Sequence, residues 1–457
     1  MSTKNNSTDK VPVLQKMCYT CGDLGVNLMH NIISSYFMLF MTNIMGIAPV
    51  IGGVIFAIAR IWDAINDPLM GSISERVKPR KLGRYRSWMA FAIVPYAVFF
   101  VLCFTNPELS MGAKIVYIGC IYICYGMSAT MFQVPYGSLA SVMTTNTQQY
   151  SILGVFRDYG ANIAGTVVSL TAVILITHFG GDMNTQEGFT RTAILVGVVA
   201  VLFMCLAVFG TKERVQTTVE PTKLKDCMKA FTKNRPSQIL CGVVFFFSLG
   251  NAFRLVWTPY YCMYYLGDAN VISTILSIMF AIPLGMLLLV PFLTKKFGKK
   301  TVLAFGNIFL AGSGIFFMFA KDSYFLIILA SIFCGLSLGM AFSVIWGMLP
   351  DTVNYGEWKT GIRASGFIYA IGVFAVKLGS AVANFGAGTY LSILGYDASL
   401  GMNQLPEVQE GINLANGLTA IFFGVCALII LSFYKLDKNT CDKIEVELAD
   451  MRAAKIK

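Results

Sequence analysis

Apolar segments long enough to cross a lipid bilayer recur along the whole of this sequence. A helix needs about 20 predominantly apolar residues to span the hydrocarbon core. Twelve candidate spans lie near residues 22–42, 48–73, 88–105, 113–143, 152–178, 192–209, 238–265, 271–293, 301–320, 325–349, 366–394 and 412–433. Charged residues make up only 13% of the chain, about half of their usual share in soluble proteins. The sequence therefore predicts an all-α polytopic membrane protein and excludes a soluble enzyme.

Basic residues are distributed unevenly between the two sides of these spans. If there are twelve spans, one side holds the clusters at 4–16, 76–86, 212–235, 295–300, 359–363 and 435–457. The opposite side has only Lys114, Arg191 and Lys321. The positive-inside rule then predicts that both termini lie in the cytoplasm of a cell carrying this protein in its cell membrane. These basic loops account for the net charge of +11 and would face anionic lipid headgroups. No nucleic-acid partner is needed to explain the charge.

Two halves of the sequence repeat one another weakly. The run Lys-Leu-Gly-Arg-Tyr-Arg at 81–86 follows the second span, and Lys-Phe-Gly-Lys-Lys at 296–300 follows the eighth. A basic loop after the second span of each half is typical of transporters built from two bundles. The predicted division is an N-terminal six-helix bundle at 1–210, a cytoplasmic linker at 211–236, a C-terminal six-helix bundle at 237–434 and a cytoplasmic tail at 435–457.

Two aspartates lie inside the second apolar segment. Asp63 and Asp67 are four residues apart, so a helix places them on one face, with Asn66 beside them and Arg60 nearly one turn earlier. An ionised aspartate at the centre of a lipid-facing helix costs about 2.5–3.5 kcal/mol on insertion scales, and such residues usually have a function. Carboxylate and amide oxygens suit a small hard cation such as Na⁺. A proton is the other cargo that fits, and a buried ion pair between Arg60 and Asp63 is the purely structural interpretation.

Motifs for catalysis or for a resident cofactor are missing from the sequence. No HExxH, GxSxG or carboxylate–histidine cluster occurs, and His30 and His178 are the only histidines. Cys18 and Cys21 have CxxC spacing, but no second pair supports a zinc site. We therefore expect no enzyme activity and no cofactor other than a co-transported Na⁺ or H⁺.

Four segments spread over both halves carry a specific resemblance. They read R-I-W-D-A-I-N-D-P-L-M-G at 60–71, K-L-G-R-Y-R-S-W at 81–88, V-P-Y-G-S-L-A at 134–140 and D-T-V-N-Y-G-E-W-K-T-G-I-R at 351–363. Together they resemble the glycoside–pentoside–hexuronide:cation symporters of the major facilitator superfamily. The resemblance implies the major facilitator fold, with twelve transmembrane helices in two six-helix bundles, and symport of a small-molecule glycoside with a monovalent cation by a functional monomer.

The resemblance also implies roles for individual residues. Asp63, Asn66, Asp67 and Thr130 match the Na⁺ ligands of the sodium-coupled members. Arg157 and Lys377 match intramembrane basic residues at the sugar cavity, where Lys377 would lie between the cation and sugar sites. A structural alternative for Arg157 is a pair with Asp158 or a side chain that snorkels to the membrane surface.

Departures from the family pattern bear on the substrate. Asn27 and Gln133 stand where the melibiose permease has acidic residues, and Gly137 stands where it has a tryptophan. Neutral amides with a retained Arg157 favour a hexuronide such as a glucuronide, whose carboxylate arginine binds well, or a neutral pentoside. Tyr136 and Trp346 are candidate stacking platforms for the sugar. A lysolipid carrier of the same superfamily and a neutral oligosaccharide or galactoside symporter are the alternatives.

Charged residues near the predicted cytoplasmic ends form a candidate gate. Asp351 and Glu357 follow the tenth span, and the basic loop at 76–86 follows the second. We expect these groups to form cytoplasmic ion pairs that hold one conformational state, and Arg60 to couple cation binding to that change. Ordinary topology signalling is the alternative for the loop charges.

Overall fold

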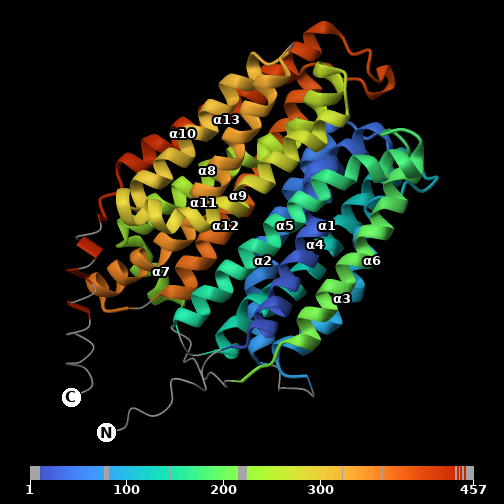
Figure 1. The fold of residues 1–457 in the computed structure, drawn as a ribbon. Coiled ribbons are helices and arrows are strands. Elements are labelled where there is room, and N and C mark those ends of the chain that lie inside the picture. The colour runs from blue at the N-terminus through green and yellow to red at the C-terminus, as the bar shows by residue number, and fades with distance from the viewer. Residues whose placement is uncertain are drawn as a thin grey trace. The chain divides into compact units, whose positions relative to one another are not determined.

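The computed structural model describes residues 11–76, 82–144, 147–214, 224–321, 323–362, 364–437, 440–441, 443–444 and 447–448 (Figure 1). Its α-helices are α1 (Val13–Asn43), α2 (Pro49–Arg76), α3 (Tyr85–Leu102), α4 (Met111–Met143), α5 (Thr147–Gly180), α6 (Gln186–Gly210), α7 (Leu224–Thr232), α8 (Arg235–Tyr260), α9 (Asn270–Phe297), α10 (Lys299–Met318), α11 (Tyr324–Thr360), α12 (Ser365–Ile393) and α13 (Pro406–Ser432). A π-helical turn, η1 (Tyr261–Leu266), extends α8, and a short 3₁₀ turn, η2 (Ala398–Leu400), follows α12.

Twelve of the described helices are long and apolar enough to cross a membrane. They confirm the predicted all-α membrane fold, and only α7, a short amphipathic helix in the predicted linker, was not expected. The largest boundary difference is in α11, which continues past residue 349 to Thr360. Pro350 lies inside this helix. The helix tolerates it because a proline removes only one backbone donor, and neighbouring groups in membrane helices can satisfy the carbonyl that loses its partner. Asp351 and Glu357 therefore lie on a helix and not in a loop.

The chain divides into two compact units that do not follow the sequence order. Unit 1 comprises residues 1–218, 258–281 and 384–409, and unit 2 comprises residues 219–257, 282–383 and 410–457. Unit 1 thus contains α1 to α6, the last residues of α8, η1, the first part of α9, the last part of α12, η2 and the first residues of α13. The bundle boundaries predicted from the sequence, 1–210 and 237–434, remain a prediction.

Within unit 1, α1 is the central helix and packs against α5 and α6, while α4 packs against α2 and α3. Close approach of the helices depends on small residues. A Cβ atom on Gly25 would lie 2.7 Å from the carbonyl oxygen of Ala200, and one on Gly160 would lie 2.6 Å from that of Thr20. Small residues at such contacts are typical of helix packing in membranes, where dispersion replaces the hydrophobic effect.

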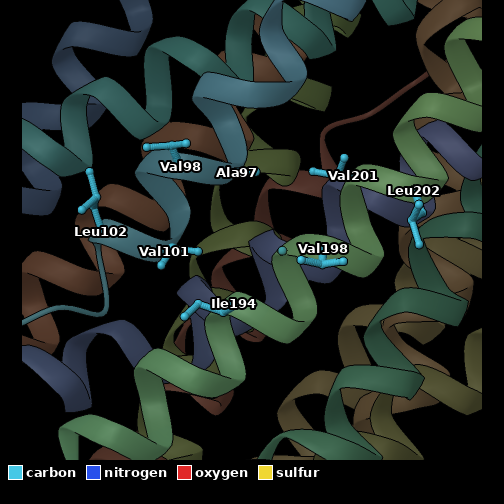
Figure 2. A pocket seen from close by; sticks show the side chains of 9 residues that line it. Ala97, Val98, Val101, Leu102, Ile194, Val198, Val201 and Leu202 are labelled. Atoms are coloured by element: carbon cyan, nitrogen blue, oxygen red, sulfur yellow. The ribbon is translucent and has the colours of Figure 1, made fainter.

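The outer face of α3 and α6 is apolar. Val98, Val198 and Leu202 are exposed there, and a shallow hollow of about 400 Å³ between the two helices is lined only by apolar residues. Figure 2 shows these side chains, which come from successive turns of both helices. Such a surface fits contact with lipid acyl chains, which agrees with the membrane assignment.

A polar network closes the end of unit 1 at the carboxyl end of α1. The hydroxyl of Tyr396 donates to Asn43 Oδ1 at 2.7 Å and lies 2.8 Å from the hydroxyl of Tyr264. Asn43 Nδ2 donates to the Tyr264 hydroxyl at 2.5 Å, and the hydroxyls of Thr42 and Tyr260 are 3.0 Å apart. We call these five residues the tyrosine network. It joins α1 to η1 and to the segment that follows α12.

The opposite end of unit 1 is held by a half-buried carboxylate cap. Glu213 accepts hydrogen bonds at 2.9–3.0 Å from the backbone N–H groups of Arg84, Tyr85 and Arg86, at the first turn of α3. Gly83, with a φ of 113°, allows the chain to turn into this position. A carboxylate is favourable there because the first amides of a helix lack acceptors within the helix.

Candidate functional site

Asp67 on α2 and Thr130 on α4 are in direct contact. The Thr130 hydroxyl donates to Asp67 Oδ1 at 2.7 Å, and Thr130 is 4% exposed. The contact exists because α2 and α4 pack against each other along this stretch. The two residues were assigned to one site from the sequence, although they are 63 positions apart. Carboxylate and hydroxyl oxygens are of the kind that a small hard cation takes as ligands.

Asp63 lies one turn earlier on α2 and is 5% exposed. Arg60 Nη1 lies 3.0 Å from Asp63 Oδ2, and Arg60 Nη2 donates to the Tyr122 hydroxyl at 3.3 Å. On α4, a Cβ atom at Gly126 would lie 3.0 Å from Asp63 Oδ1. The glycine therefore leaves the room in which the carboxylate faces α4. The ion pair that was the structural alternative for Asp63 is thus present, next to the Asp67–Thr130 contact.

Asn66 lies on the same stretch of α2. Its Nδ2 atom is buried and has no hydrogen-bond partner among the described residues. An unsatisfied buried amide is unusual and calls for an explanation, such as a ligand that turns or moves the group. With both carboxyls ionised, Asp63, Asp67 and Arg60 carry a net charge of −1. One monovalent cation would neutralise this charge. The residue types of the cluster are also suited to a monovalent cation.

Arg157 on α5 pairs with Asp23 on α1, and not with Asp158. The Arg157 Nε and Nη2 atoms lie 3.4 and 3.5 Å from the two Asp23 carboxylate oxygens. The alternative of a pair with Asp158 is therefore wrong. Sequence reasoning missed Asp23, although it is an acidic residue inside the first predicted span, and that position was the available signal.

Tyr136 fixes the surroundings of this pair. Its ring stacks on Tyr19 with centroids 4.6 Å apart, and the Arg157 guanidinium lies 5.0 Å from its centroid. Its hydroxyl donates to the Tyr19 carbonyl at 2.6 Å and accepts from the backbone N–H of Asp23 at 3.2 Å. Because Tyr136 is fully buried, it positions Arg157 and Asp23 and does not offer a free face to a sugar in this structure.

The other predicted sugar-site residues of unit 1 lie nearby on α1 and α4. Asn27 Nδ2 donates to the backbone carbonyl of Asp23 at 2.8 Å, one turn earlier on α1. Gln133 is exposed on α4. A Cβ atom at Gly137 would lie 3.9 Å from Arg157 Nη1, so the glycine leaves this guanidinium nitrogen open where a tryptophan would crowd it.

Unit 2 contains the remaining predicted residues. Trp346 on α11 is half-buried and stacks with Tyr369 on α12, with centroids 6.5 Å apart and the rings nearly parallel. Lys377 is half-buried on α12. The structure thus places Trp346 and Lys377 on neighbouring segments of one unit, and their relation to the residues of unit 1 remains a prediction.

Unit 2 also contains a buried basic residue inside a candidate membrane span. Arg254 on α8 is 1% exposed. It donates to Asn416 Oδ1 at 2.5 Å and to Ser313 Oγ at 3.4 Å, and its guanidinium lies 4.4 Å from the centroid of Phe317. These contacts tie α8 to α10 and α13, so Arg254 has a packing role within unit 2.

Of the predicted gate residues, Asp351 has an identified partner. Lys299 Nζ lies 2.6 Å from Asp351 Oδ2, and it also donates to the carbonyl of Gly347 at 3.0 Å. This pair lies within unit 2. Glu357 is half-buried one and a half turns further along α11. Residues 77–81 of the basic loop lie outside the described residues, so the ion pairs predicted for that loop remain a prediction.

Comparisons with known proteins agree with this architecture. A family model described as MFS/sugar transport protein matches residues 18–438. The isoprimeverose transporter of Lactiplantibacillus pentosus is 31% identical over 434 residues, which cover 94% of this chain and 90% of the relative. A putative sulfoquinovose importer of Escherichia coli is 30% identical over 454 residues, which cover 96% and 94% of the two chains.

Solved structures share the fold. The inward-open xylose transporter XylE from E. coli superposes with a TM-score of 0.67 at 14% identity, covering 94% of this chain and 98% of that one. At this identity the likeness shows the fold alone. It confirms the major facilitator architecture that the motifs implied.

Proposed function

This chain belongs to the MFS/sugar transport protein family, and from that membership we propose that it is a secondary active symporter of a glycoside. The co-transported ion is Na⁺ or H⁺, and both move inward by alternating access of two bundles, 1–210 and 237–434, around a site near the bilayer midplane. Both termini are cytoplasmic in this proposal, and the monomer is the functional unit. The relatives named for isoprimeverose and sulfoquinovose transport support a sugar as the substrate.

The observation that carries the proposal is the acidic cluster between α2 and α4. Two buried or half-buried carboxylates inside a membrane helix are costly and are retained for ion or proton transport in most proteins. The net charge of −1 over Asp63, Asp67 and Arg60 matches one monovalent cation. We propose that Asp63, Asn66, Asp67 and Thr130 supply the oxygen ligands, because the Thr130 hydroxyl already lies 2.7 Å from Asp67.

Coupling follows from the position of Arg60. In this structure the guanidinium holds Asp63 at 3.0 Å, so a cation that binds Asp63 competes with Arg60. Release of Arg60 would change its contact with Tyr122 on α4 and so shift α4, which also carries Gln133. Binding of the cation then raises the affinity for the sugar, and linkage requires the sugar to raise the affinity for the cation by the same factor.

The Asp23–Arg157 pair affects which sugar we expect as the substrate, because it determines how well the site accepts a negative charge. A guanidinium that already has a carboxylate partner gains less from a second one, and Asp23 repels a hexuronate. We therefore propose a neutral pentoside as the first substrate to test and a hexuronide as the second. Asp23, Arg157 and the amides of Asn27 and Gln133 would bind sugar hydroxyls, and Lys377 and Trp346 would be the sugar ligands of unit 2.

Uptake into proteoliposomes tests the proposal. A labelled aryl β-xyloside and a labelled aryl β-glucuronide are offered under an inward Na⁺ gradient or an inward proton gradient. We expect accumulation of the xyloside under Na⁺ and loss of accumulation in Asp67→Asn. Accumulation under the proton gradient alone would make Asp63 and Asp67 proton carriers and remove Asn66 and Thr130 from the site. If neither compound moves under either gradient, the glycoside assignment is wrong.

A further inference from the structure

A second hollow with a different chemistry lies at one end of unit 2. Its volume is about 920 Å³, within the range of small-molecule binding sites. It is formed by the last turn of α9, the first turn of α10, the middle of α11 and the segment that follows α13. Five lysines line it, and we call it the lysine pocket: Lys295, Lys296, Lys299, Lys300 and Lys435.

Two of these lysines are engaged with the protein. Lys299 pairs with Asp351 at 2.6 Å. Lys300 donates to the backbone carbonyls of Ser432 at 3.2 Å and Tyr434 at 2.6 Å. Both interactions hold the walls of the pocket in place.

The remaining charges leave the lysine pocket strongly positive. Lys295, Lys296 and Lys435 have no ion-pair partner among the described residues. The second acid of the lining, Asp437, accepts hydrogen bonds from the hydroxyl and the N–H of Thr440, which lower the pKa of its carboxyl. Five lysines and the two ionised acids Asp351 and Asp437 give a net charge of +3.

The equivalent position in the first half of the chain holds an anionic side chain. In the first half, the chain turns at Gly83 and the carboxylate of Glu213 caps the first amides of α3. In the second half, the chain turns at Gly298, with a φ of 83°, and this glycine, as the N-cap of α10, has no side chain that could accept from the first amides. The first residues of α10 line the lysine pocket instead. Helix amino termini favour anions. At the amino end of α3 the carboxylate of Glu213 is that anion, whereas at the amino end of α10 backbone amides and lysines are available to an anion from outside the chain.

An apolar face leads along α9 to the lysine pocket. Leu288, Leu289 and Phe292 are exposed by 65%, 54% and 73%, and Phe297 at the end of the helix is 45% exposed. Pro291 of the same helix lines the pocket. Because α9 is long and apolar enough to cross a membrane, this face suits contact with lipid acyl chains. A positive pocket at the end of a lipid-facing helix matches a molecule with an anionic head and apolar tails.

We propose that the lysine pocket binds the phosphate headgroup of an anionic phospholipid, whose acyl chains lie along the exposed face of α9. The phosphate contacts Lys295, Lys296 and Lys435 and the first turn of α10. This site is separate from sugar and cation transport, and it is tested without a transport assay. The positive-inside distribution of the basic loops puts it at the cytoplasmic leaflet, which is rich in anionic lipids.

The test is lipid retention by the purified full chain, measured by native mass spectrometry in detergent titrated with phosphatidylglycerol. The variant is Lys295→Gln/Lys296→Gln/Lys435→Gln. Each lysine near an anionic lipid contributes about 1 kcal/mol, so we expect a roughly 100-fold weaker apparent affinity in the variant. The triple arginine variant at the same positions keeps the charge and should bind within a few-fold of the wild type.

The matched control removes three exposed cationic charges elsewhere in unit 2, as Lys229→Gln/Lys233→Gln/Lys359→Gln. It should bind phosphatidylglycerol like the wild type. Equal loss in both glutamine variants would mean general charge attraction and would overturn the site. Equal retention in wild type and pocket variant, or equal affinity for phosphatidylcholine, would also overturn it. Competition by glycerol phosphate at the same concentration as the lipid would show that the pocket takes a free phosphate and not a phospholipid.

Discussion

The Thr130 hydroxyl offers the sharpest test of the cation site, because it can be removed with little change in volume. It is 4% exposed and donates to Asp67 Oδ1 at 2.7 Å. In the proposed Na⁺ complex the same oxygen turns its lone pair toward the ion, while Asp67 stays in place. Thr130→Ala deletes this ligand and leaves both carboxylates, so it separates Na⁺ coordination from the simple presence of charge.

The size of the effect follows from the strength of an interaction between a hydroxyl and a charged group. Such an interaction contributes about 1.5–3 kcal/mol, and each 1.4 kcal/mol is a factor of ten in affinity. We therefore expect the half-saturating Na⁺ concentration for xyloside uptake to rise roughly 10- to 150-fold in Thr130→Ala. Thr130→Ser keeps the hydroxyl and should stay within a few-fold of the wild type.

The assay is initial xyloside uptake into proteoliposomes over a series of Na⁺ concentrations, with protein amount and orientation matched between variants. If Thr130→Ala leaves the Na⁺ dependence of uptake unchanged while Asp67→Asn abolishes uptake, the Thr130 hydroxyl is not a Na⁺ ligand. Thr130 would then be a packing residue, and the two carboxylates would bind Na⁺ without its hydroxyl.

Three further predictions concern other parts of the chain. Asp23→Asn frees the Arg157 guanidinium from its carboxylate partner, so the ratio of glucuronide to xyloside uptake should rise at least tenfold in a competition assay; an unchanged ratio would exclude Asp23 from selectivity. Glu213→Gln weakens the carboxylate cap of α3 by about 1–2 kcal/mol and should lower the thermal unfolding midpoint by a few degrees, whereas an unchanged midpoint would contradict the cap. Tyr396→Phe removes two hydrogen bonds of the tyrosine network. Alkylation of the buried Cys262, measured in a variant that lacks the other cysteines, should then become several-fold faster. An unchanged alkylation rate would mean that the network does not shield Cys262 from solvent.

The fold was predictable from the sequence because the membrane imposes it. Long apolar runs can only be helices, since backbone groups find no water partners in lipid, and the twelve spans were confirmed. The likeness of the motifs to sugar symporters was confirmed at the level of the MFS/sugar transport family. The end of α11 was missed, because a proline and acidic residues usually mark a helix end, and here the helix continues past both.

The candidate site was only partly predictable. Asp63, Asn66 and Asp67 share a helix face by spacing alone, and their packing against Thr130 was implied by the resemblance. The partner of Arg157 was not predictable from local spacing, because Asp23 is 134 residues away and the adjacent Asp158 offered an obvious pair. Which carboxylate a buried arginine meets depends on helix packing, here that of α1 against α5.

The most direct measurement is the reciprocal flux, in which an inward gradient of the aryl β-xyloside drives Na⁺ into proteoliposomes that start with equal Na⁺ on both sides. The account predicts xyloside-dependent Na⁺ entry in the wild type and none in Asp67→Asn at equal protein amount. Xyloside entry with neither Na⁺ nor proton movement, or cation entry that persists in Asp67→Asn, would contradict symport through the acidic cluster of α2.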